Sequence, residues 1–310
     1  MTAIAARELT RTFGPFVAVD RLTFDVREGE IFGVLGANGA GKSTTIRMLC
    51  GLLAPTSGAA TVAGIDVARD PEGVKRRIGY MSQRFSLYEA LTVDQNIRFF
   101  GGIYGLERRK LEERRRFVIA MAGLEGREHM RTRDLAGGWR QRLALGCALL
   151  HEPPIVFLDE PTAGVDPLSR RRFWLLIDQL SASGVTVLVT THYLDEAEHC
   201  HRLAIIHAGR LAALGAPSDL KRLFRGRSML EIRSSTPIEA MRRLDEMPEV
   251  AKTSVFGTAV HVLLAEGQPA DPAGLADRLR RGGVDVAAVE AVQPSLEDVF
   301  LEVAERTERP

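Results

Sequence analysis

The sequence lacks an apolar segment long enough to cross a bilayer. Its longest stretch without a charged side chain, residues 48–65, is interrupted by Gly51, Pro55 and Gly58, whereas a membrane-spanning helix needs about 20 predominantly apolar residues. The first residues, MTAIAARELTRTF, have no apolar core of the kind that a secretory signal has. We therefore expect a chain without transmembrane helices that resides in the cytoplasm.

Cysteine is scarce, and neither sign of charge dominates. Cys50, Cys147 and Cys200 have no metal-ligand spacing, so we expect buried free thiols. The 41 Lys and Arg residues stand against 40 Asp and Glu residues, so no overall positive field favours a nucleic acid partner. We expect none. Any contact with a membrane must be local.

Three apolar runs with strand character end in polar or glycine-rich segments. They are Ile31–Leu35, 155–158 and 185–190. The first run is followed by a glycine-rich turn and then by residues 42–53, whose apolar residues are spaced as in a helix. Ligands of open α/β sheets bind at the carboxyl ends of the strands. The pattern therefore predicts an α/β sheet on which these three strand ends converge.

Two further regions differ in character from the predicted sheet. Residues 91–126 favour a helical insert that begins with Thr92 and Gln95 at capping-box spacing. Its basic residues alternate with glutamates, which favours a solvated helix face. Past Leu223 the pattern follows the order βαββαβ of a ferredoxin-like unit, with strands near 229–232, 250–256, 260–264 and 284–289, helices over 237–247 and 272–281, and a last helix over 295–305.

Residues 36–43, GANGAGKS, fit a phosphate-binding loop. Glycines let backbone N–H groups approach phosphate oxygens, and the following helix N-terminus favours negative charge. Lys42 would reach the outer phosphates, and the Ser43 hydroxyl would bind Mg²⁺. Asp159 and Glu160 follow the second strand, where one carboxylate can hold Mg²⁺ through water while the other orients an attacking water. Alone, such a pair can equally be a solvated strand end.

Taken together, the motifs resemble those of the ABC transporter nucleotide-binding domain, from about Ile4 to about Phe224. GANGAGKST resembles the Walker A loop, IVFLDEP the Walker B motif, and IGYMSQ with Gln83 the Q-loop. LAGGWRQR resembles the signature motif, AGVD the D-loop, and TTHY the switch histidine, His192. The resemblance implies an α/β P-loop NTPase fold with a helical subdomain. We expect this ATP-binding domain at 1–224, with the insert at about 84–150, and a small α+β accessory domain at 225–310.

The resemblance also implies ATP and Mg²⁺ as cofactors and assigns roles to residues. Glu160 is implied as the catalytic base, together with His192 and Gln83, and Ser43, Gln83 and Asp159 as the Mg²⁺ ligands. The residues implied to bind ATP are Phe13, which stacks on adenine, and Gly36, Ala37, Asn38, Gly39, Ala40, Gly41, Lys42, Ser43 and Thr44. The residues implied to reach the ATP of a second subunit are Leu135, Ala136, Gly137, Gly138 and Trp139, with Asp166 in the D-loop.

Two residues depart from the family pattern, Ala136 where serine is normal and Trp139 where glutamine is commonest. Ala136 removes one expected phosphate contact. The family pattern implies two ATPase subunits bound head to tail, as a homodimer or a heterodimer, and a separate permease of about six spans. The chain would then lie on the cytoplasmic face of the membrane. The surface resembling the permease contact holds Phe85, Leu87, Tyr88 and Leu91, just beyond Gln83.

The ending PSLEDVFL resembles the tail of drug-efflux ATPases, which favours export of a drug or a related hydrophobic molecule. A soluble ABC ATPase of translation or DNA repair is the main alternative. Such proteins usually carry two cassettes or a long coiled coil, and this sequence has neither. A regulatory or sugar-import ATPase is less compatible with the tail. The transported molecule is not encoded in this chain.

Overall fold

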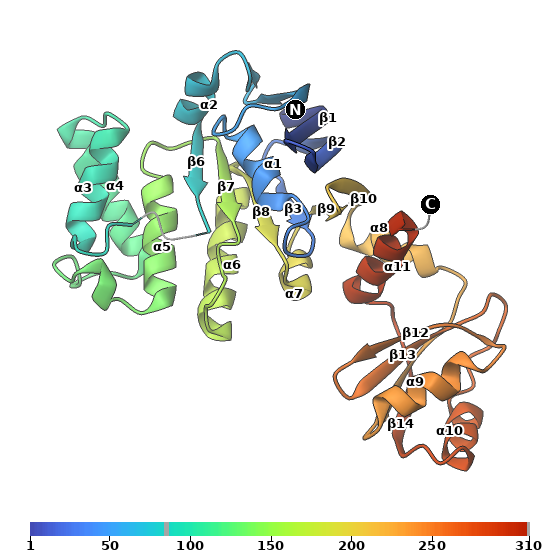
Figure 1. Cartoon of the computed structure of the whole chain (residues 1–310). Helices are drawn as coiled ribbons and strands as arrows, with labels where there is room; N and C mark the ends of the chain where they lie inside the picture. Colours follow the sequence, from blue (N-terminus) through green and yellow to red (C-terminus); the bar gives the residue numbers. More distant parts are fainter. Residues whose placement is uncertain (84–86, 309–310) are drawn as a thin grey trace. The chain divides into compact units, whose positions relative to one another are not determined.

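The computed structural model describes residues 1–83 and 87–308. The chain divides into two compact units, Met1–Pro217 and Ser218–Pro310 (Figure 1). This division lies slightly before the domain boundary predicted after Phe224. The short helices α8, Pro217–Lys221, and η2, Arg222–Phe224, precede that position. Phe224 is buried and lies beside Met229 and Leu263 of the second unit.

The main sheet of the first unit has six strands in the order β10-β9-β3-β8-β7-β6. The strands β9, β3, β8, β7 and β6 are parallel, and β10 is antiparallel to β9. Every residue of β3, β7 and β8 is buried, as expected for parallel strands covered on both faces. The bounds are β3 Ile31–Leu35, β6 Ile78–Met81, β7 Ile155–Asp159, β8 Thr186–Thr191, β9 Arg202–His207 and β10 Arg210–Gly215. The predicted convergence of three strand ends is confirmed, because β8 lies between β3 and β7.

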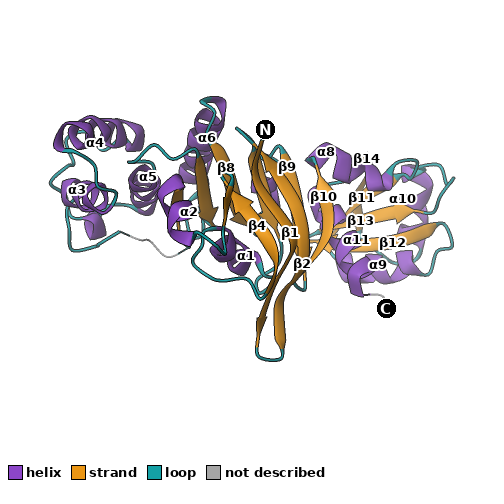
Figure 2. Cartoon of the chain, turned by 90° about the horizontal axis from the view of Figure 1, so that it is seen from above, coloured by secondary structure: helices purple, strands orange, loops and turns teal. Residues whose placement is uncertain are grey.

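A second, antiparallel sheet was not anticipated from the sequence. Its order is β2-β1-β4-β5, with β1 Thr2–Phe13, β2 Phe16–Arg27, β4 Ser57–Val62 and β5 Ile65–Asp66. Figure 2 shows β1 and β2 as a long hairpin that extends beyond the other strands. The rings of Phe24 and Phe32 stack at 5.3 Å and join the cores of the two sheets. The helix α1, Lys42–Leu49, packs against β2, β4 and β7. It ends earlier than predicted, because the next N–H groups bond back to Met48 and Arg47 in a closing turn.

The helical insert contains α3, Val93–Ile103, α4, Arg108–Ala122, and α5, Gly137–Ala148, with the short η1, Thr132–Asp134, before α5. The predicted capping box is confirmed: Thr92 Oγ1 accepts from Gln95 N at 3.2 Å, and Gln95 Oε1 accepts from Thr92 N at 2.9 Å. Lys110 and Arg114 of α4 both pair with Glu152, at 2.8 and 3.2 Å. The predicted solvated face is confirmed only in part, because Arg114 and Arg115 are 11% and 21% exposed and pair with acids. The first unit also contains α2 Pro71–Arg77, α6 Pro167–Ala182 and α7 Leu194–Ala197.

The expected state of the cysteines is confirmed. Cys50, Cys147 and Cys200 are free and buried, and burial raises the pKa of all three thiols. A thiol held in its neutral form is a poor nucleophile and metal ligand. Within residues 1–83 and 87–308, no helix combines the length and the apolarity that crossing a membrane requires.

The second unit has the topology of a ferredoxin-like domain, as predicted. Its antiparallel sheet has the order β12-β13-β11-β14. The elements are β11 Met229–Ser234, α9 Pro237–Asp245, β12 Val250–Phe256, β13 Ala259–Leu264, α10 Pro272–Arg281, β14 Val286–Val292 and α11 Leu296–Glu308. The strand β14 starts later than predicted, because Val284 N bonds to Leu279 O in the turn that ends α10.

The two faces of this sheet are covered by different helices. Ile232 and Val262 share a core with Leu244 of α9 and Leu279 of α10. Residues that alternate with them along the strands face α11. There, His261 Nδ1 lies 2.9 Å from Asp298 Oδ1, and this hydrogen bond raises the pKa of His261. The sheet therefore packs apolar contacts on one face and an ion-paired helix on the other.

Candidate active site

The loop between β3 and α1 has a backbone conformation that requires glycine at its last position. Gly41 has a φ of +105°, and a Cβ there would lie 2.6 Å from the carbonyl oxygen of Ala18. A residue with a side chain would be both strained and obstructed. The loop therefore reaches the N-terminus of α1 in close contact with β2, and unpaired N–H groups at a helix N-terminus attract anions.

Lys42 places a buried ammonium group beside this loop. Its Nζ donates to the carbonyl oxygens of Gly36 and Ala37 at 2.9 and 3.1 Å and lies 3.2 Å from Glu160 Oε1. The side chain is only 4% exposed. These three oxygens hold the ammonium in one orientation at a pocket of about 450 Å³. A positive charge so placed can bind a phosphate group of a ligand in the pocket.

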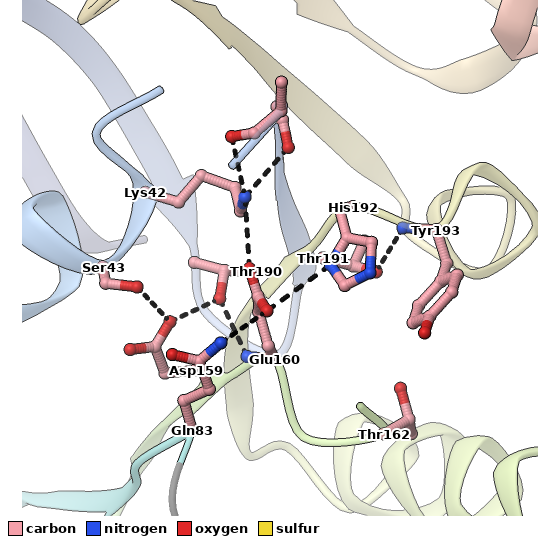
Figure 3. A network of polar contacts seen from close by, with 12 residues as sticks. Lys42, Ser43, Gln83, Asp159, Glu160, Thr162, Thr190, Thr191, His192 and Tyr193 are labelled. Carbon is pink, nitrogen blue, oxygen red and sulfur yellow. Dashed lines mark hydrogen bonds and ion pairs between the residues drawn. The ribbon is translucent and has the colours of Figure 1, made fainter. Parts of the chain in front are cut away.

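Side chains from four segments form one polar network at the carboxyl ends of the strands (Figure 3). Asp159 Oδ1 accepts a hydrogen bond from Ser43 Oγ at 3.0 Å. Gln83 Nε2 donates to Glu160 Oε2 at 2.9 Å, and His192 Nδ1 lies 3.4 Å from the same oxygen. The structure therefore brings together the predicted residues that follow β3, β6, β7 and β8.

Glu160 has an unusual backbone for a residue with a side chain. Its φ is +48°, in the left-handed region, where strain is often found at functional sites. Thr190 Oγ1 accepts a hydrogen bond from Glu160 N at 2.9 Å and donates one to Asp159 Oδ1 at 2.7 Å. The pairing of Asp159 with Thr190 between β7 and β8 sets this arrangement. Sequence reasoning missed Thr190, although a hydroxyl near the end of a buried strand is a usable signal.

The pocket is lined on another side by the β1–β2 hairpin. Phe13 is 46% exposed, and the Arg11 guanidinium lies 4.6 Å from its ring centroid. The lining residues are Phe13, Phe16, Ala18, Asn38, Gly39, Gly41, Lys42, Ser43, Thr44, Gln83 and Glu160. Of the other predicted loop residues, Gly36 and Ala37 contact Lys42, and Ala40 is buried in the core.

The residues at 135–139 do not line this pocket among the described residues. Leu135 is buried, and Ala136 occupies the N-cap position of α5 without a side-chain hydrogen bond. Gly137 and Gly138 form the first turn, and Trp139 lies under the Arg127 guanidinium, 4.1 Å away. Within residues 1–83 and 87–308, the start of α5 is therefore not part of the lining of the Lys42 pocket.

Asp166 lies at the start of α6. Its Oδ1 accepts from Ser169 N at 2.9 Å, which caps the helix. Hydrogen bonds from Ser169 lower the pKa of Asp166. A Cβ placed at Gly138 would lie 2.5 Å from Ser169 Oγ. The start of α5 and the start of α6 are therefore in direct contact.

The sequence of the chain matches known protein families. The sequence matches the ABC transporter family over residues 19–163, the C-terminal domain of DrrA1-3-like ATP-binding proteins over 215–304, and an AAA domain over 140–194. The Nod factor export ATP-binding protein I of Cupriavidus metallidurans is 36% identical over 100% of both chains. The linearmycin resistance ATP-binding protein LnrL of Bacillus subtilis is 32% identical over 99% of both. This chain belongs to the ABC transporter ATP-binding proteins.

Other comparisons agree on the ABC ATPase fold. "Probable multidrug ABC transporter ATP-binding protein YbhF" of Escherichia coli is 54% identical over 71% of this chain, which spans only 38% of that protein. An ATP-binding subunit of an ABC transporter is 33% identical, covers 72% of this chain and 93% of its own, and superposes with a TM-score of 0.65. The ATP-binding cassette MJ0796, dimeric and bound to ADP and Pi, is 25% identical, with coverage of 69% and 98% and a TM-score of 0.63. The predicted family and fold class are confirmed.

A buried carboxylate that sequence reasoning missed connects two loops of this ABC ATPase. Glu196, 1% exposed, accepts hydrogen bonds from Thr162 Oγ1 and, at 2.7 Å, from Thr191 Oγ1. The Arg170 guanidinium lies 3.2 Å from Glu196 Oε1. Thr162 follows Glu160 by two positions, and Thr191 directly precedes His192. Glu196 therefore holds together the segments that carry Glu160 and His192.

We expect Glu196→Gln to lower the turnover of ATP with little change in KM. The amide keeps the size of the side chain but removes its charge, so Arg170 loses its buried ion pair and keeps only the one with the exposed Asp195, and the two loops can shift. Misplacement of reacting groups by about 1 Å can cost on the order of 100-fold in rate. Steady-state ATPase kinetics check this, with the exposed Glu198→Gln as control. If Glu196→Gln and Glu198→Gln lower kcat equally, or if Glu196→Gln raises only KM, Glu196 does not position the two loops for catalysis.

Proposed function

We propose that this chain binds and hydrolyses ATP with Mg²⁺ and, as one of two such subunits, powers export through a separate membrane permease. The observation that carries the proposal is the single buried network in which Lys42, Gln83 and His192 all approach the carboxylate of Glu160. This network and the loop before α1 place a phosphate site next to a carboxylate that can act as a base. Phosphoryl transfer to water needs the phosphates and the attacking water to be held in fixed positions relative to each other.

The chain's own residues divide the work of binding between them. The loop N–H groups and Lys42 would hold the phosphates. The exposed ring of Phe13 offers a stacking surface for the base of the nucleotide. The donors for Mg²⁺ would be Ser43, Asp159 and the amide oxygen of Gln83, an all-oxygen set of the kind that Mg²⁺ prefers.

The fit to Mg²⁺ rests on the convergence of Ser43 Oγ and Asp159 Oδ1, which lie 3.0 Å apart. Among the described residues, no group of three His, Cys, Asp or Glu side chains could hold a metal by itself. A shared site with the phosphates fits this donor set, because Mg²⁺ in such sites keeps water and phosphate ligands. When bound, the ion would neutralise the charge that develops on the phosphates.

Glu160 is suited to act as the general base. Its side chain is 7% exposed, and the carboxylate is contacted by Lys42 on one oxygen and by Gln83 and His192 on the other. A carboxylate held in this way can orient an attacking water and accept its proton. His192, which directly follows β8, would donate to a phosphate oxygen.

A second subunit would complete the site. Residues 135–139 do not line the described pocket of their own chain, and α5 is long enough for its N-terminus to bind an anion. MJ0796, which shares this fold, is dimeric. We therefore propose that Ala136, Gly137 and Gly138 face the ATP held by another subunit, whether identical to this chain or not.

Replacing Glu160 with Gln should leave ATP binding intact and slow hydrolysis by roughly 10²–10⁴-fold, because general-base assistance is removed. Single-turnover hydrolysis with saturating Mg-ATP measures the rate, and a fluorescent ATP analogue measures binding. The exposed Glu125→Gln serves as control. Hydrolysis by Glu160→Gln at the wild-type rate would exclude Glu160 as the base.

Replacing Ala136 with Ser should tighten ATP-dependent dimerisation, measured in a Glu160→Gln background. The backbone N–H groups of Gly137 and Gly138 already provide anion binding, and the hydroxyl adds one bond to a charged acceptor, worth roughly 1.5–3 kcal/mol before water competes. Because residue 136 is an N-cap, serine can also stabilise α5 within one subunit. Thermal unfolding of the monomer separates the two effects. An unchanged dimerisation midpoint would show that the backbone alone sets the affinity.

The surface beyond Gln83 supports the permease as partner. Tyr88 and Phe99 are 50% and 41% exposed, with ring centroids 4.6 Å apart. Asn96, fully buried, accepts from Tyr88 N at 2.9 Å and donates to Tyr88 O at 3.0 Å. A rigidly held aromatic pair at the surface suits docking of a helix from a partner.

The sequence prediction for this surface needs one correction. Leu87 is 6% exposed, so it belongs to the core and not to the contact surface. Leu91 is half-buried, and Phe85 lies outside the described residues. We propose the aromatic pair of Tyr88 and Phe99 as the contact instead.

The names of the relatives support a proposal for the substrate class. Their names specify multidrug transport, linearmycin resistance and Nod factor export. We infer export of an organic molecule, a drug or a related hydrophobic substrate, through a permease of about six spans. The chain would bind that permease at the cytoplasmic face of the membrane.

The double variant Tyr88→Ala/Phe99→Ala should keep the ATPase rate of the isolated subunit and lose copurification with the coexpressed permease. Large apolar anchors at an interface typically contribute 2 kcal/mol or more each, so we expect roughly a 100-fold or greater loss of affinity. The control is Phe117→Ala, which removes a ring of similar exposure, 40%, from α4. Unchanged copurification of the double variant would place the contact elsewhere.

A further inference from the structure

The second unit contains a hollow of about 640 Å³ that is lined in part by basic side chains. Four cationic residues line it: Lys221, Arg222, Arg225 and Arg227. They come from α8, η2 and the turn that follows. None of the described residues that line the hollow is an Asp or a Glu. The hollow is therefore a site of positive potential in a chain whose overall charge is nearly balanced.

Two of these guanidinium groups have no partner among the described residues. Arg222 pairs with Asp219 at 3.1 Å, but the side chains of Arg225 and Arg227 make no hydrogen bond or ion pair within residues 1–83 and 87–308. Nε of Arg227 is buried and unsatisfied. Arginine cannot shed its proton to relieve this. A buried donor without an acceptor is costly, so the arrangement favours an anionic acceptor from outside the chain.

Much of the remaining lining of the hollow is apolar. Phe224 and Met229, which are both buried, line it together with Ala291, Val292 and Pro294, while Ser218, Ser228 and Gln293 add polar groups. The volume falls within the range of roughly 300–1,000 Å³ found for small-molecule sites. A lone inorganic anion would leave most of this volume unfilled. The lining thus matches a ligand with an anionic end and a less polar body.

We propose that this hollow binds an organic phosphate ester. The guanidinium group matches a phosphate with two parallel hydrogen bonds, which a lysine cannot reproduce. Arg225 and Arg227 would take the phosphate, and the wall formed by Val292 and Pro294 would contact the organic part. The ligand is either a soluble phosphate ester or the glycerophosphate headgroup of an anionic lipid. The site is separate from the Lys42 pocket and does not depend on ATP hydrolysis.

Binding is tested on the full chain with the Lys42 pocket saturated by Mg-ADP, so that phosphate does not bind there. Glycerol 3-phosphate, followed by calorimetry, tests the soluble source. Sedimentation with phosphatidylglycerol vesicles, compared with phosphatidylcholine vesicles, tests the lipid source. The variants are Arg225→Gln and Arg227→Gln. Arg281→Gln, at the exposed end of α10, makes the same change in charge away from the hollow.

We expect Arg225→Gln and Arg227→Gln each to weaken binding about tenfold, which corresponds to about 1.4 kcal/mol, and Arg281→Gln to leave it unchanged. If the two variants weaken binding of glycerol 3-phosphate, the ligand is a soluble phosphate ester. If they weaken binding only to phosphatidylglycerol vesicles, the ligand is a lipid headgroup. Absence of binding to both probes overturns the proposal. Equal weakening by Arg281→Gln also overturns it, because the effect would then be one of general charge.

Folding of the variants is checked by thermal unfolding. Arg225 is exposed, so its variant should unfold at the wild-type temperature. Should the partly buried Arg227 variant unfold early, Arg227→Lys replaces it, since lysine keeps the charge and loses the paired hydrogen bonds. We expect Arg227→Lys to bind more weakly than wild type, and wild-type affinity in it would overturn the role of the guanidinium.

Discussion

The hydrogen bonds between the carboxyl ends of β7 and β8 are the constraint on which the active site depends. The Thr190 hydroxyl accepts from the backbone of Glu160 and donates to the carboxylate of Asp159. A left-handed backbone at a residue with a side chain costs on the order of 1–3 kcal/mol, and these bonds help to offset that cost at Glu160. The reversed backbone directs the Glu160 side chain toward Lys42, while that of Asp159 meets Ser43. Two adjacent acids thereby serve different partners.

The short segment after β6 is anchored at both of its described ends. Gln83 donates to the Glu160 carboxylate, and Tyr88 is held by the buried amide of Asn96, which also donates to Thr132 Oγ1 at 2.8 Å. One end is thus bonded to the acid that we assign as the base, and the other to the helical insert. Gln83 and Tyr88 are five positions apart in the sequence. In the proposed function, a partner that docks at Tyr88 would therefore bind close along the chain to a residue that contacts Glu160.

Sequence reasoning succeeded where backbone geometry dictates the residue type. Local sequence is enough to predict the glycine at Gly41, the capping box at Thr92 and the order of short strands and helices in the second unit. The antiparallel sheet was missed because β4, SGAATV, has little strand character of its own and depends on pairing with β1. Glu196 was missed because its partner Thr162 lies 34 positions away. Leu87 was misplaced because the burial of one side chain depends on tertiary packing, which the local sequence does not show.

Ser169 joins the two segments that we assign to the interface between subunits. Its backbone N–H caps α6 through Asp166, and its hydroxyl lies where any side chain at Gly138 would have to go. The N-termini of α5 and α6 are consequently fixed to each other by one residue. In the proposed dimer they would approach the second subunit as a single surface, with Ala136 exposed at its edge. The missing hydroxyl of Ala136 therefore removes one contact without disturbing the backbone of Gly137 and Gly138, because nothing else in the described chain is bonded to that side chain.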